Sequence, residues 1–383
     1  MTDRETDMSI AKLAAAQTNW LAAADRVAAI AGAAARANDE EDAFVTAGYD
    51  ALKREGLFKA HVPAELGGGG ASYEEMSAII RRIAASCGAT ALAFAMHTHI
   101  VALNAWRWRH DNAPTEGLLK RVAAEDLVLV SSGGSDWLQS AGKATKVEGG
   151  FKIDARKAFA SGCPMGDLLV TSAVYEDPEA GPTVLHFAVS LKAEGVSIAE
   201  TWRTLGMRGT GSHDIVLEGA FVPDAAVSAR RPQGKWHPLF HAISMLAFPI
   251  IYAAYVGVAE GARARALEIA RKRLIVDPAM VGAMENAFAE TVMAHERMIA
   301  LAGGERPGPE TTNQAMIGRT LVGRAAIRTV ECALEVAGGA AFYRDTGLER
   351  AFRDVQAARF HPLQEGAQKT YAGRVALGLD IDG

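Results

Sequence analysis

The stretch from Asp126 to Gly134, DLVLVSSGG, marks the point at which the hydrophobic pattern of this 383-residue chain changes its period. Before it, apolar residues recur three and four positions apart, as in Leu21, Ala24 and Val27, which predicts helices from Ile10 to about His110. After it come short runs rich in β-branched residues and separated by turn residues, which are typical of strands. These runs are residues 127–130, 144–153, 168–175, 184–191 and 215–222. Their spacing predicts a small antiparallel barrel or sandwich.

The helical period returns after Pro223 and a linker at residues 230–234. Four long helices are expected, over residues 246–273, 280–302, 313–337 and 348–377. The predicted fold class is therefore α+β. We expect an N-terminal α-helical domain at residues 1–125, a middle β-domain at 126–228 and a C-terminal helical bundle at 229–383.

Composition narrows the class of protein. Hydrophobic residues make up 49% of the chain and charged residues 22%, which suits a packed globular protein. With 40 Lys and Arg against 45 Asp and Glu, and no basic cluster interleaved with aromatic residues, nucleic acid is not an expected partner. The longest apolar run, residues 243–259, contains Pro249 and two tyrosines, so we interpret it as a buried helix and expect no membrane partner.

The cysteines and the N-terminus indicate a cytoplasmic protein. Cys87, Cys163 and Cys332 are odd in number and far apart, so they form neither a disulfide framework nor a CxxC metal site. The first residues, Met1 to Asp7, are charged, and an alanine-rich helix follows them rather than an export signal.

Several common catalytic motifs are missing. No GxGxxG follows a strand, and no GxxxxGK[ST], HExxH or GxSxG occurs, so the usual signatures of Rossmann, P-loop, zinc-hydrolase and serine-hydrolase chemistry are absent. His97 and His99 are two positions apart on a predicted helix and therefore lie on different faces, and Pro238 interrupts His237 and His241. We expect no metal site.

Six short motifs follow one another in an order that resembles the acyl-CoA dehydrogenase superfamily of flavoproteins. They are VPAELGG at 62–68, SSGGSD at 131–136, KAFASG at 157–162, Trp202 with LGMRGTGS at 205–212, GGAAFY at 338–343 and ERAFRD at 349–354. The resemblance covers nearly the whole chain. It implies an acyl-CoA dehydrogenase-like fold, with an antiparallel β-barrel as the middle domain and a four-helix bundle at the C-terminus.

The same resemblance implies a flavin site. Hydroxyl and backbone N–H groups of Ser131, Ser132 and Ser161 would satisfy the polar edge of the isoalloxazine ring, and Phe159 would cover one of its faces. Gly338 and Gly339 resemble the element that meets the flavin of a neighbouring subunit in this family, which implies a homotetramer. The adenosine clamp of the FAD-dependent dehydrogenases is not recognisable at residues 271–278, so tight FAD binding is not expected.

Two chemistries occur in the superfamily, and the residues favour one of them. The two usual positions of the dehydrogenase Glu are here Pro362 and Ala247. His361, seven residues after Asp354, stands where the flavin-dependent monooxygenases of the superfamily carry an active-site His, and a His handles protons near neutrality. The resemblance therefore implies a monooxygenase for a small organic substrate. It would use O₂ and reduced FMN or FAD from a partner flavin reductase, with His361 and Ser161 as catalytic residues.

Two alternatives remain open at this point. One is an FAD-dependent acyl-CoA dehydrogenase with Glu365 as the base, although the polar stretch around Glu365 favours a solvated position. The other is a non-catalytic scaffold that binds a flavin or an acyl group. For the monooxygenase and the dehydrogenase alike, the expected lining of the substrate pocket is His97, Phe248 and Tyr252. For His97, a position in the core is the more frequent alternative.

Overall fold

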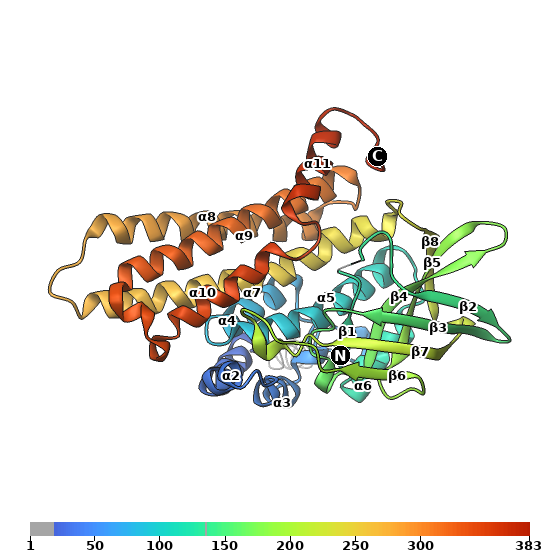
Figure 1. Ribbon diagram of the computed structural model, residues 1–383, viewed down its shortest axis with the longest axis horizontal. Coiled ribbons are helices and arrows are strands. Elements are labelled where there is room, and N and C mark those ends of the chain that lie inside the picture. The colour runs from blue at the N-terminus through green and yellow to red at the C-terminus, as the bar shows by residue number, and fades with distance from the viewer. Residues whose placement is uncertain (1–18, 135) are drawn as a thin grey trace, which may run out of the picture.

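The computed structural model describes residues 19–134 and 136–383. The expected start of the first helix at Ile10, the charged segment from Met1 to Asp7 and the loop residue Ser135 lie outside the described residues. From the N-terminus the helices are α2 (Trp20–Glu40), α3 (Thr46–Arg54), α4 (Tyr73–Ala84), α5 (Gly88–His110) and α6 (Glu116–Glu125). The predicted helical first part is confirmed for these residues. Figure 1 shows α5 in the middle of the molecule, and it is buried along most of its length because it contacts α4, α7 and β1.

A sheet follows the first helices. Its strands are β1 (Leu129–Ser131), β2 (Lys143–Val147), β3 (Gly150–Lys157), β4 (Leu168–Asp177), β5 (Gly181–Ser190), β6 (Val196–Ala199), β7 (Asp214–Pro223) and β8 (Val227–Pro232). They are arranged in the order β6-β7-β3-β2-β4-β5-β8, with β1 beside β4. An apolar cluster that includes Val130, Phe151, Ile153 and Phe187 packs on one face.

The predicted closed antiparallel barrel is wrong. Within the described residues the strand order ends at β6 and β8, which do not pair, so the sheet is open. It is also mixed, because β1 and β2 each run parallel to β4. A barrel closes only when its two edge strands pair with each other, whereas here β6 pairs with β7 and β8 pairs with β5.

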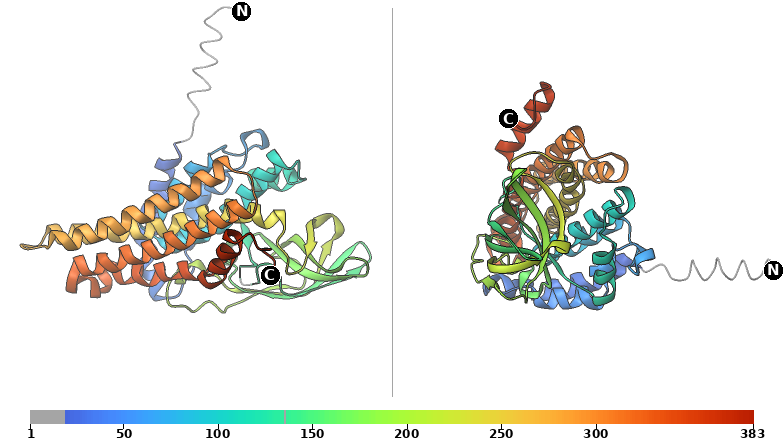
Figure 2. Two further views of the ribbon diagram at one scale, coloured as in Figure 1. Left: turned by 90° about the horizontal axis from the view of Figure 1, so that it is seen from above. Right: turned by 90° about the vertical axis from the view of Figure 1, so that its right-hand side faces the viewer.

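The last part of the chain is helical. Its helices are α7 (Pro238–Arg271), α8 (Pro278–Gly304), α9 (Pro309–Ala337), α10 (Leu348–Val355) and α11 (Glu365–Ala376). The long helices α7, α8 and α9 lie side by side and point away from the sheet (Figure 2). Helix α7 is long and apolar enough to cross a membrane, but 94% of its most apolar window is buried inside the protein. The interpretation of residues 243–259 as a buried helix is confirmed.

One expected helix is broken in the structure. The sequence pattern predicts a continuous helix over residues 348–377, whereas the chain leaves the helix after Val355, forms a short 3₁₀ turn at Gln356–Arg359 and resumes only at Glu365. Pro362 accounts for part of the break, because proline has no N–H to donate and disfavours helical backbone before it. The break places His361 in a turn rather than on a helix face.

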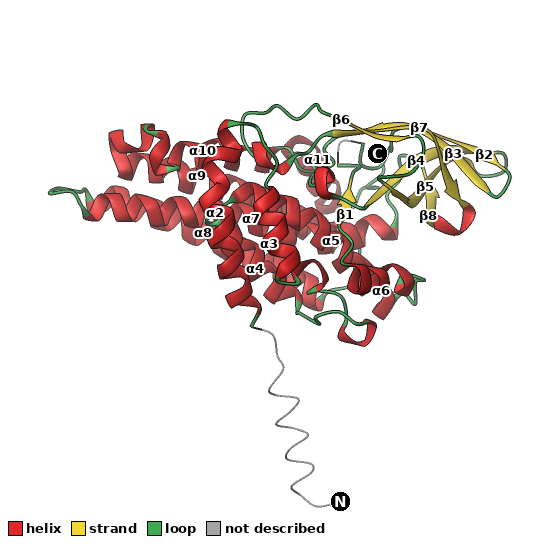
Figure 3. Cartoon of the chain, turned by 90° about the horizontal axis from the view of Figure 1, so that it is seen from below, coloured by secondary structure: helices red, strands yellow, loops and turns green. Residues whose placement is uncertain are grey.

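The two helical parts share one apolar core, whereas the sheet has a core of its own. Figure 3 shows the sheet at one end of the molecule and the helices at the other. The loops that carry the recognised motifs lie where the sheet meets the helices, at residues 131–134 and 136, 157–162 and 205–212. The carbonyl of Gly209 accepts a hydrogen bond from Val45 of the N-terminal part, and Gly206 packs against Arg353 of α10.

Candidate functional site

The loop that follows β1 is anchored by a buried ion pair. One carboxylate oxygen of Asp136 accepts hydrogen bonds from the Lys157 ammonium at 2.8 Å and from the Ala141 N–H at 2.6 Å. The Lys157 side chain is 1% exposed, and burial lowers its pKa while Asp136 opposes that shift. Ser132 Oγ donates to Thr171 Oγ1 at 2.7 Å. The loop therefore has a defined position at the end of β1.

Two buried polar atoms in this loop have no hydrogen-bond partner among the described residues. They are the second carboxylate oxygen of Asp136 and the indole nitrogen of Trp137. Buried polar groups in proteins are nearly always paired, so unpaired ones point to a missing ligand or water. Together with the hydroxyls of the loop, they fit a polar, planar ligand at this end of the sheet.

The Phe159 side chain is exposed on the segment that follows β3. Its φ is +59° and its side chain is 54% exposed, with its ring edge-on to Trp202 at a centroid distance of 5.9 Å. The Ser161 N–H donates to the Phe159 carbonyl at 3.0 Å and so stabilises this turn. The next residue, Gly162, has a φ of +81°, and a Cβ there would collide with the Tyr49 hydroxyl. An exposed ring held in this way suits stacking on a flat ligand.

Ser161 belongs to a chain of hydroxyl groups. Its Oγ lies 2.7 Å from Ser212 Oγ, which lies 2.7 Å from Thr210 Oγ1, and Thr210 Oγ1 donates to the Met207 carbonyl at 2.8 Å. Ser212 and Thr210 come from the 205–212 loop, so the predicted residue Ser161 and this motif meet in space. Both segments stand out in the sequence, whereas the contact between them appears only in the structure.

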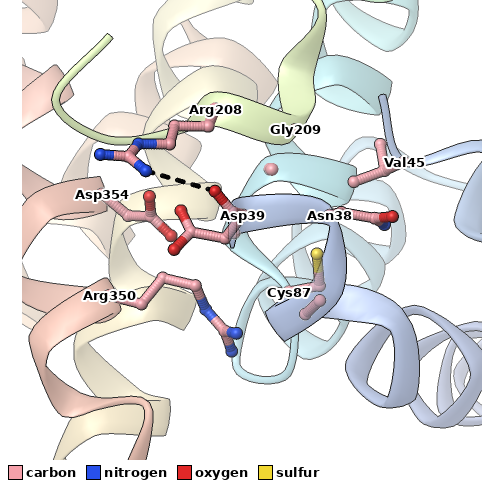
Figure 4. Close-up of a pocket in the computed structure, with 11 residues that line it drawn as sticks. Asn38, Asp39, Val45, Cys87, Arg208, Gly209, Arg350 and Asp354 are labelled. Carbon is pink, nitrogen blue, oxygen red and sulfur yellow. Dashed lines mark hydrogen bonds between the residues drawn. The ribbon is translucent and has the colours of Figure 1, made fainter. Parts of the chain in front are cut away.

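Helix α10 holds the 205–212 loop in place. The Asp354 carboxylate accepts a hydrogen bond from the Met207 N–H at 2.5 Å, and burial raises its pKa to about 6. Beside it, Arg353 forms a largely buried ion pair with Asp39 at 2.5 Å. Figure 4 shows Asp39, Arg208 and Asp354 around one small pocket, with the Arg208 guanidinium donating to the Asp39 carbonyl. All three parts of the chain therefore meet at this loop.

The turn after α10 brings His361 to the same region. Its Nε2 lies 2.5 Å from the hydroxyl oxygen of Tyr255 on α7, and its carbonyl accepts a hydrogen bond from Arg319 at 2.8 Å. The following residue, Pro362, lies 3.6 Å from where a Cβ on Gly134 would stand, so the turn packs against the loop after β1. Tyr255 was not predicted as a site residue, although a tyrosine within the apolar run 243–259 was a usable signal.

The pair formed by Tyr255 and His361 is neutral. Burial lowers the pKa of His361 to about 3, and the positive charge of Arg319 acts in the same direction. Burial also raises the pKa of Tyr255 well above its ordinary value. The Tyr255 hydroxyl has no other hydrogen-bond acceptor among the described residues, so it donates to Nε2, and the ring proton of the neutral His361 lies on Nδ1. At this site His361 is a neutral hydrogen-bond donor.

The residues expected to line a substrate pocket are all buried. His97 Nε2 donates to the Phe58 carbonyl at 2.7 Å and its Nδ1 accepts from the Leu129 N–H at 2.9 Å, so both ring nitrogens are used within the core. The Tyr252 hydroxyl donates to the Ala358 carbonyl at 2.7 Å. Phe248 lies 6.0 Å from the ring of Trp137 and so packs beside the loop after β1.

The remaining predicted residues lie away from this cluster. Glu365 forms ion pairs with Arg324 and Lys369 at the surface, and these cations lower its pKa to about 2. Gly338 is at the end of α9, where Arg273 donates to the carbonyls of residues 336 and 337. Gly338 and Gly339 lie at the end of the bundle that points away from the sheet, far along the chain of helices from the loop after β1.

Comparison with known proteins agrees with this geometry. Family models described as the N-terminal, middle and C-terminal domains of acyl-CoA dehydrogenase match residues 16–113, 131–220 and 250–365. The chain is 29% identical to amino sugar nitrososynthase RubN8 of Streptomyces rubradiris over 91% of this chain and 87% of that one. It is 25% identical to the flavin-dependent monooxygenase oxygenase subunit HsaA of Rhodococcus jostii, over 86% and 91%.

A solved structure shows the same fold. KijD3 in complex with FMN and dTDP-3-amino-2,3,6-trideoxy-4-keto-3-methyl-D-glucose superposes with a TM-score of 0.86 and 26% identity, covering 95% of each chain. The family models together account for well over half of the sequence. On this evidence the chain belongs to the acyl-CoA dehydrogenase family and is a flavin-dependent oxidoreductase.

Proposed function

We propose that this protein is the oxygenase of a two-component monooxygenase, which takes reduced FMN or FAD from a partner reductase and oxygenates a small organic substrate with O₂. The observation that carries the proposal is the neutral pair of His361 and Tyr255 beside the loop after β1. A dehydrogenase needs a carboxylate to remove the α-proton of an acyl-CoA, and its two usual positions are Pro362 and Ala247 here.

The residues present fit a flavin. Ser131, Ser132 and Ser161 would hydrogen-bond the polar edge of the ring, and the exposed side chain of Phe159 would cover one face. When bound, reduced flavin supplies the electrons for the reaction with O₂. The apolar side chains around Trp137 and Phe248 would keep water out of the space next to the ring.

His361 would hold a proton at Nδ1. Because the Tyr255 hydroxyl donates to Nε2, the imidazole would present Nδ1–H to the substrate or to oxygen. The hydrogen bond from Arg319 to the backbone carbonyl of His361 limits movement of the turn. To act as a base at Nδ1, the ring would first have to move its proton from Nδ1 to Nε2, the nitrogen that accepts from the Tyr255 hydroxyl. The described geometry therefore supports a donor role at the start of the reaction.

An amine of an amino sugar is the first substrate class to test. RubN8 is an amino sugar nitrososynthase, and KijD3 was solved with a dTDP-linked amino sugar. The assay supplies a flavin reductase, NADH, FMN and ¹⁸O₂ together with amino sugar nucleotides, phenols and sulfur compounds. Incorporation of one ¹⁸O atom into a substrate is the expected result.

The dehydrogenase alternative is tested in the same preparation. Anaerobic mixing of FAD-loaded protein with a panel of acyl-CoAs should leave the flavin absorbance unchanged. Bleaching of the flavin by an acyl-CoA would refute the proposed monooxygenase. Loss of flavin binding in both redox states would instead support the non-catalytic scaffold that holds only an acyl group.

We further propose that the protein is a cytoplasmic homotetramer, built as a dimer of dimers. Large apolar side chains are exposed at the end of the bundle that points away from the sheet, with Leu274 at 100% and Phe342 at 92% exposure. Gly338 and Gly339 lie beside them and would meet the flavin of a neighbouring copy. Light scattering at micromolar concentration should give four times the mass of the chain, and a monomer would contradict this proposal.

A further inference from the structure

The hydroxyl chain behind Ser161 has a direction. It consists of three hydroxyl oxygens, of Ser161, Ser212 and Thr210, and it ends on the carbonyl oxygen of Met207. The three oxygen–oxygen distances are 2.7, 2.7 and 2.8 Å. Oxygens that close are attractive only with a hydrogen between them, so each contact needs one proton.

The number of hydroxyl protons determines which group donates in each of the three contacts. A carbonyl oxygen has no proton, so Thr210 must donate to Met207. Thr210 then has none left for its second contact, and Ser212 must donate to it. By the same step Ser161 must donate to Ser212. Three contacts use the three available protons, and no other assignment satisfies all of them.

Ser161 is the member of the chain that a ligand can reach. The residue is 7% exposed, compared with 3% for Ser212 and none for Thr210, so it is the least buried of the three. Because its proton points inward to Ser212, Ser161 offers only lone pairs to a ligand. A group bound at Ser161 must therefore be a hydrogen-bond donor.

The carbonyl end of the chain is rigid. The Met207 carbonyl also accepts hydrogen bonds from the Trp202 indole at 3.1 Å and from the Thr210 N–H at 3.1 Å, and the Met207 N–H is held by Asp354 at 2.5 Å. A peptide group held on both sides does not turn away. Reversal of the chain would leave Thr210 Oγ1 and this carbonyl in contact without a proton.

The oxidised and reduced states of a flavin differ in the direction of the hydrogen bond that N5 makes. N5 of oxidised flavin is an acceptor, whereas N5 of reduced flavin carries a hydrogen and is a donor. We propose that Thr210 and Ser212 make this site selective for reduced flavin, because they fix Ser161 as an acceptor. The inference rests on the proposed function, in which Ser161 lies at the N5 edge. Thr210 and Ser212 act through Ser161 and are positioning residues.

The test compares the affinities of oxidised and reduced FMN. In Thr210→Val the shape is kept, but Ser212 regains a proton for Ser161, so Ser161 is free to donate. We expect oxidised FMN to bind more tightly and the ratio of the oxidised to the reduced dissociation constant to fall about tenfold, the usual effect of one hydrogen bond. Fluorescence quenching measures the oxidised form, and anaerobic titration measures the reduced form.

An independent readout is the midpoint potential of bound FMN. Tighter binding of the reduced form raises this potential, so loss of the selectivity should lower it by about 30 mV, which corresponds to a tenfold ratio for two electrons. Thr210→Ser keeps the hydroxyl and is the matched control, and its ratio and potential should be those of the wild type. Ser212→Ala removes the acceptor of the Ser161 proton and should act as Thr210→Val does, even if the valine variant fails to fold.

The outcomes separate the two proposals. An unchanged affinity ratio in both Thr210→Val and Ser212→Ala, with FMN still bound, would overturn the selectivity of the hydroxyl chain and leave the flavin site standing. Equal loss of both redox forms in Thr210→Ser would show that the loop is merely structural and would also overturn it. If wild-type protein binds FMN in neither redox state, it is the proposed function that fails.

Discussion

His361 and Glu365 are four residues apart, yet they have opposite environments. His361 lies in the turn after α10, with its ring against the buried Tyr255 and a pKa lowered to about 3. Glu365 is the first residue of α11 and is ion-paired to Arg324 and Lys369 at the surface, with a pKa lowered to about 2. Both residue types can carry protons. The break between α10 and α11 therefore decides which of the two residues faces the loop after β1.

Removing the imidazole should have the largest effect. His361→Ala should leave folding and FMN affinity intact and lower the rate of substrate oxygenation by roughly two to four orders of magnitude, the usual contribution of a positioned proton donor. The rate is measured by oxygen consumption with a supplied reductase. A rate within twofold of the wild type would break the comparison, because His361 would then be no more important than Glu365.

Removing the partner of the imidazole should have a smaller effect. Tyr255→Phe frees His361 Nε2, so the ring is no longer held in one tautomer, and the rate should fall about tenfold, as for the loss of one hydrogen bond. The Tyr255 hydroxyl stabilises the neutral ring, so its removal should raise the pKa of His361. A pH–rate profile checks this: the wild type should show no inflection from His361 above pH 5, whereas the variant should show its acidic limb at a higher pH.

Acidification should separate buried histidines from the surface carboxylate. Burial lowers the pKa of His97 and of His295 to about 4, so between about pH 6.5 and 4 the unfolded chain binds protons that the folded chain does not. The free energy of unfolding should therefore fall as the pH falls through this window, by up to about 1.4 kcal/mol per pH unit for each such histidine. Asp354 opposes this fall below about pH 6, because its pKa is raised in the folded state.

Urea unfolding at pH 7, 6 and 5 measures this slope. Glu365 contributes only above its unfolded pKa near 4.5, and its contribution is lost below that pH, so Glu365→Gln should not change the slope between pH 7 and 5. A stability that stays constant or rises from pH 7 to pH 5 would show that the buried histidines are not held neutral.

The smallest effect is expected at Glu365 itself. Glu365→Gln removes an exposed ion pair, which typically contributes less than about 1 kcal/mol, and should change the oxygenation rate by less than twofold. The same variant is also tested in a dye-coupled assay with acyl-CoA and no oxygen. Loss of turnover in either assay would reverse the roles of the two residues and favour the dehydrogenase alternative.

The sequence predicted the class of the fold from local patterns. The change of period at Asp126 separates helices from strands, and the apolar run 243–259 is the buried part of α7. It did not predict the open sheet, because the parallel pairing of β1 and β2 with β4 depends on contacts between distant segments. Helical periodicity also hid the break before Glu365, because the pattern continues across Pro362.

The candidate site was predicted as separate motifs rather than as contacts. The motifs around Ser161, Ser212 and His361 were recognised. Their sequences do not indicate that Ser161 contacts Ser212 or that His361 contacts Tyr255. Tyr252 was the tyrosine predicted to line the pocket, yet its hydroxyl donates to the Ala358 carbonyl, and it is Tyr255 that contacts His361. Hydrogen-bond partners are set by tertiary structure, which a single sequence encodes only through its fold.

The ion pair between Asp39 and Arg353 joins residues 314 positions apart in the chain. Beside it, Asp354 holds the loop that orients Ser212 and Thr210. On the ribosome, the N-terminal helices and the sheet emerge long before these two residues do, so the loop is completed only when synthesis is almost finished. A polypeptide that stops before residue 353 has most of the chain, including the hydroxyl groups of Ser161, Thr210 and Ser212. It lacks the two residues of α10 that hold the 205–212 loop. The fixed conformation of the 205–212 loop is therefore among the last features that the nascent chain acquires.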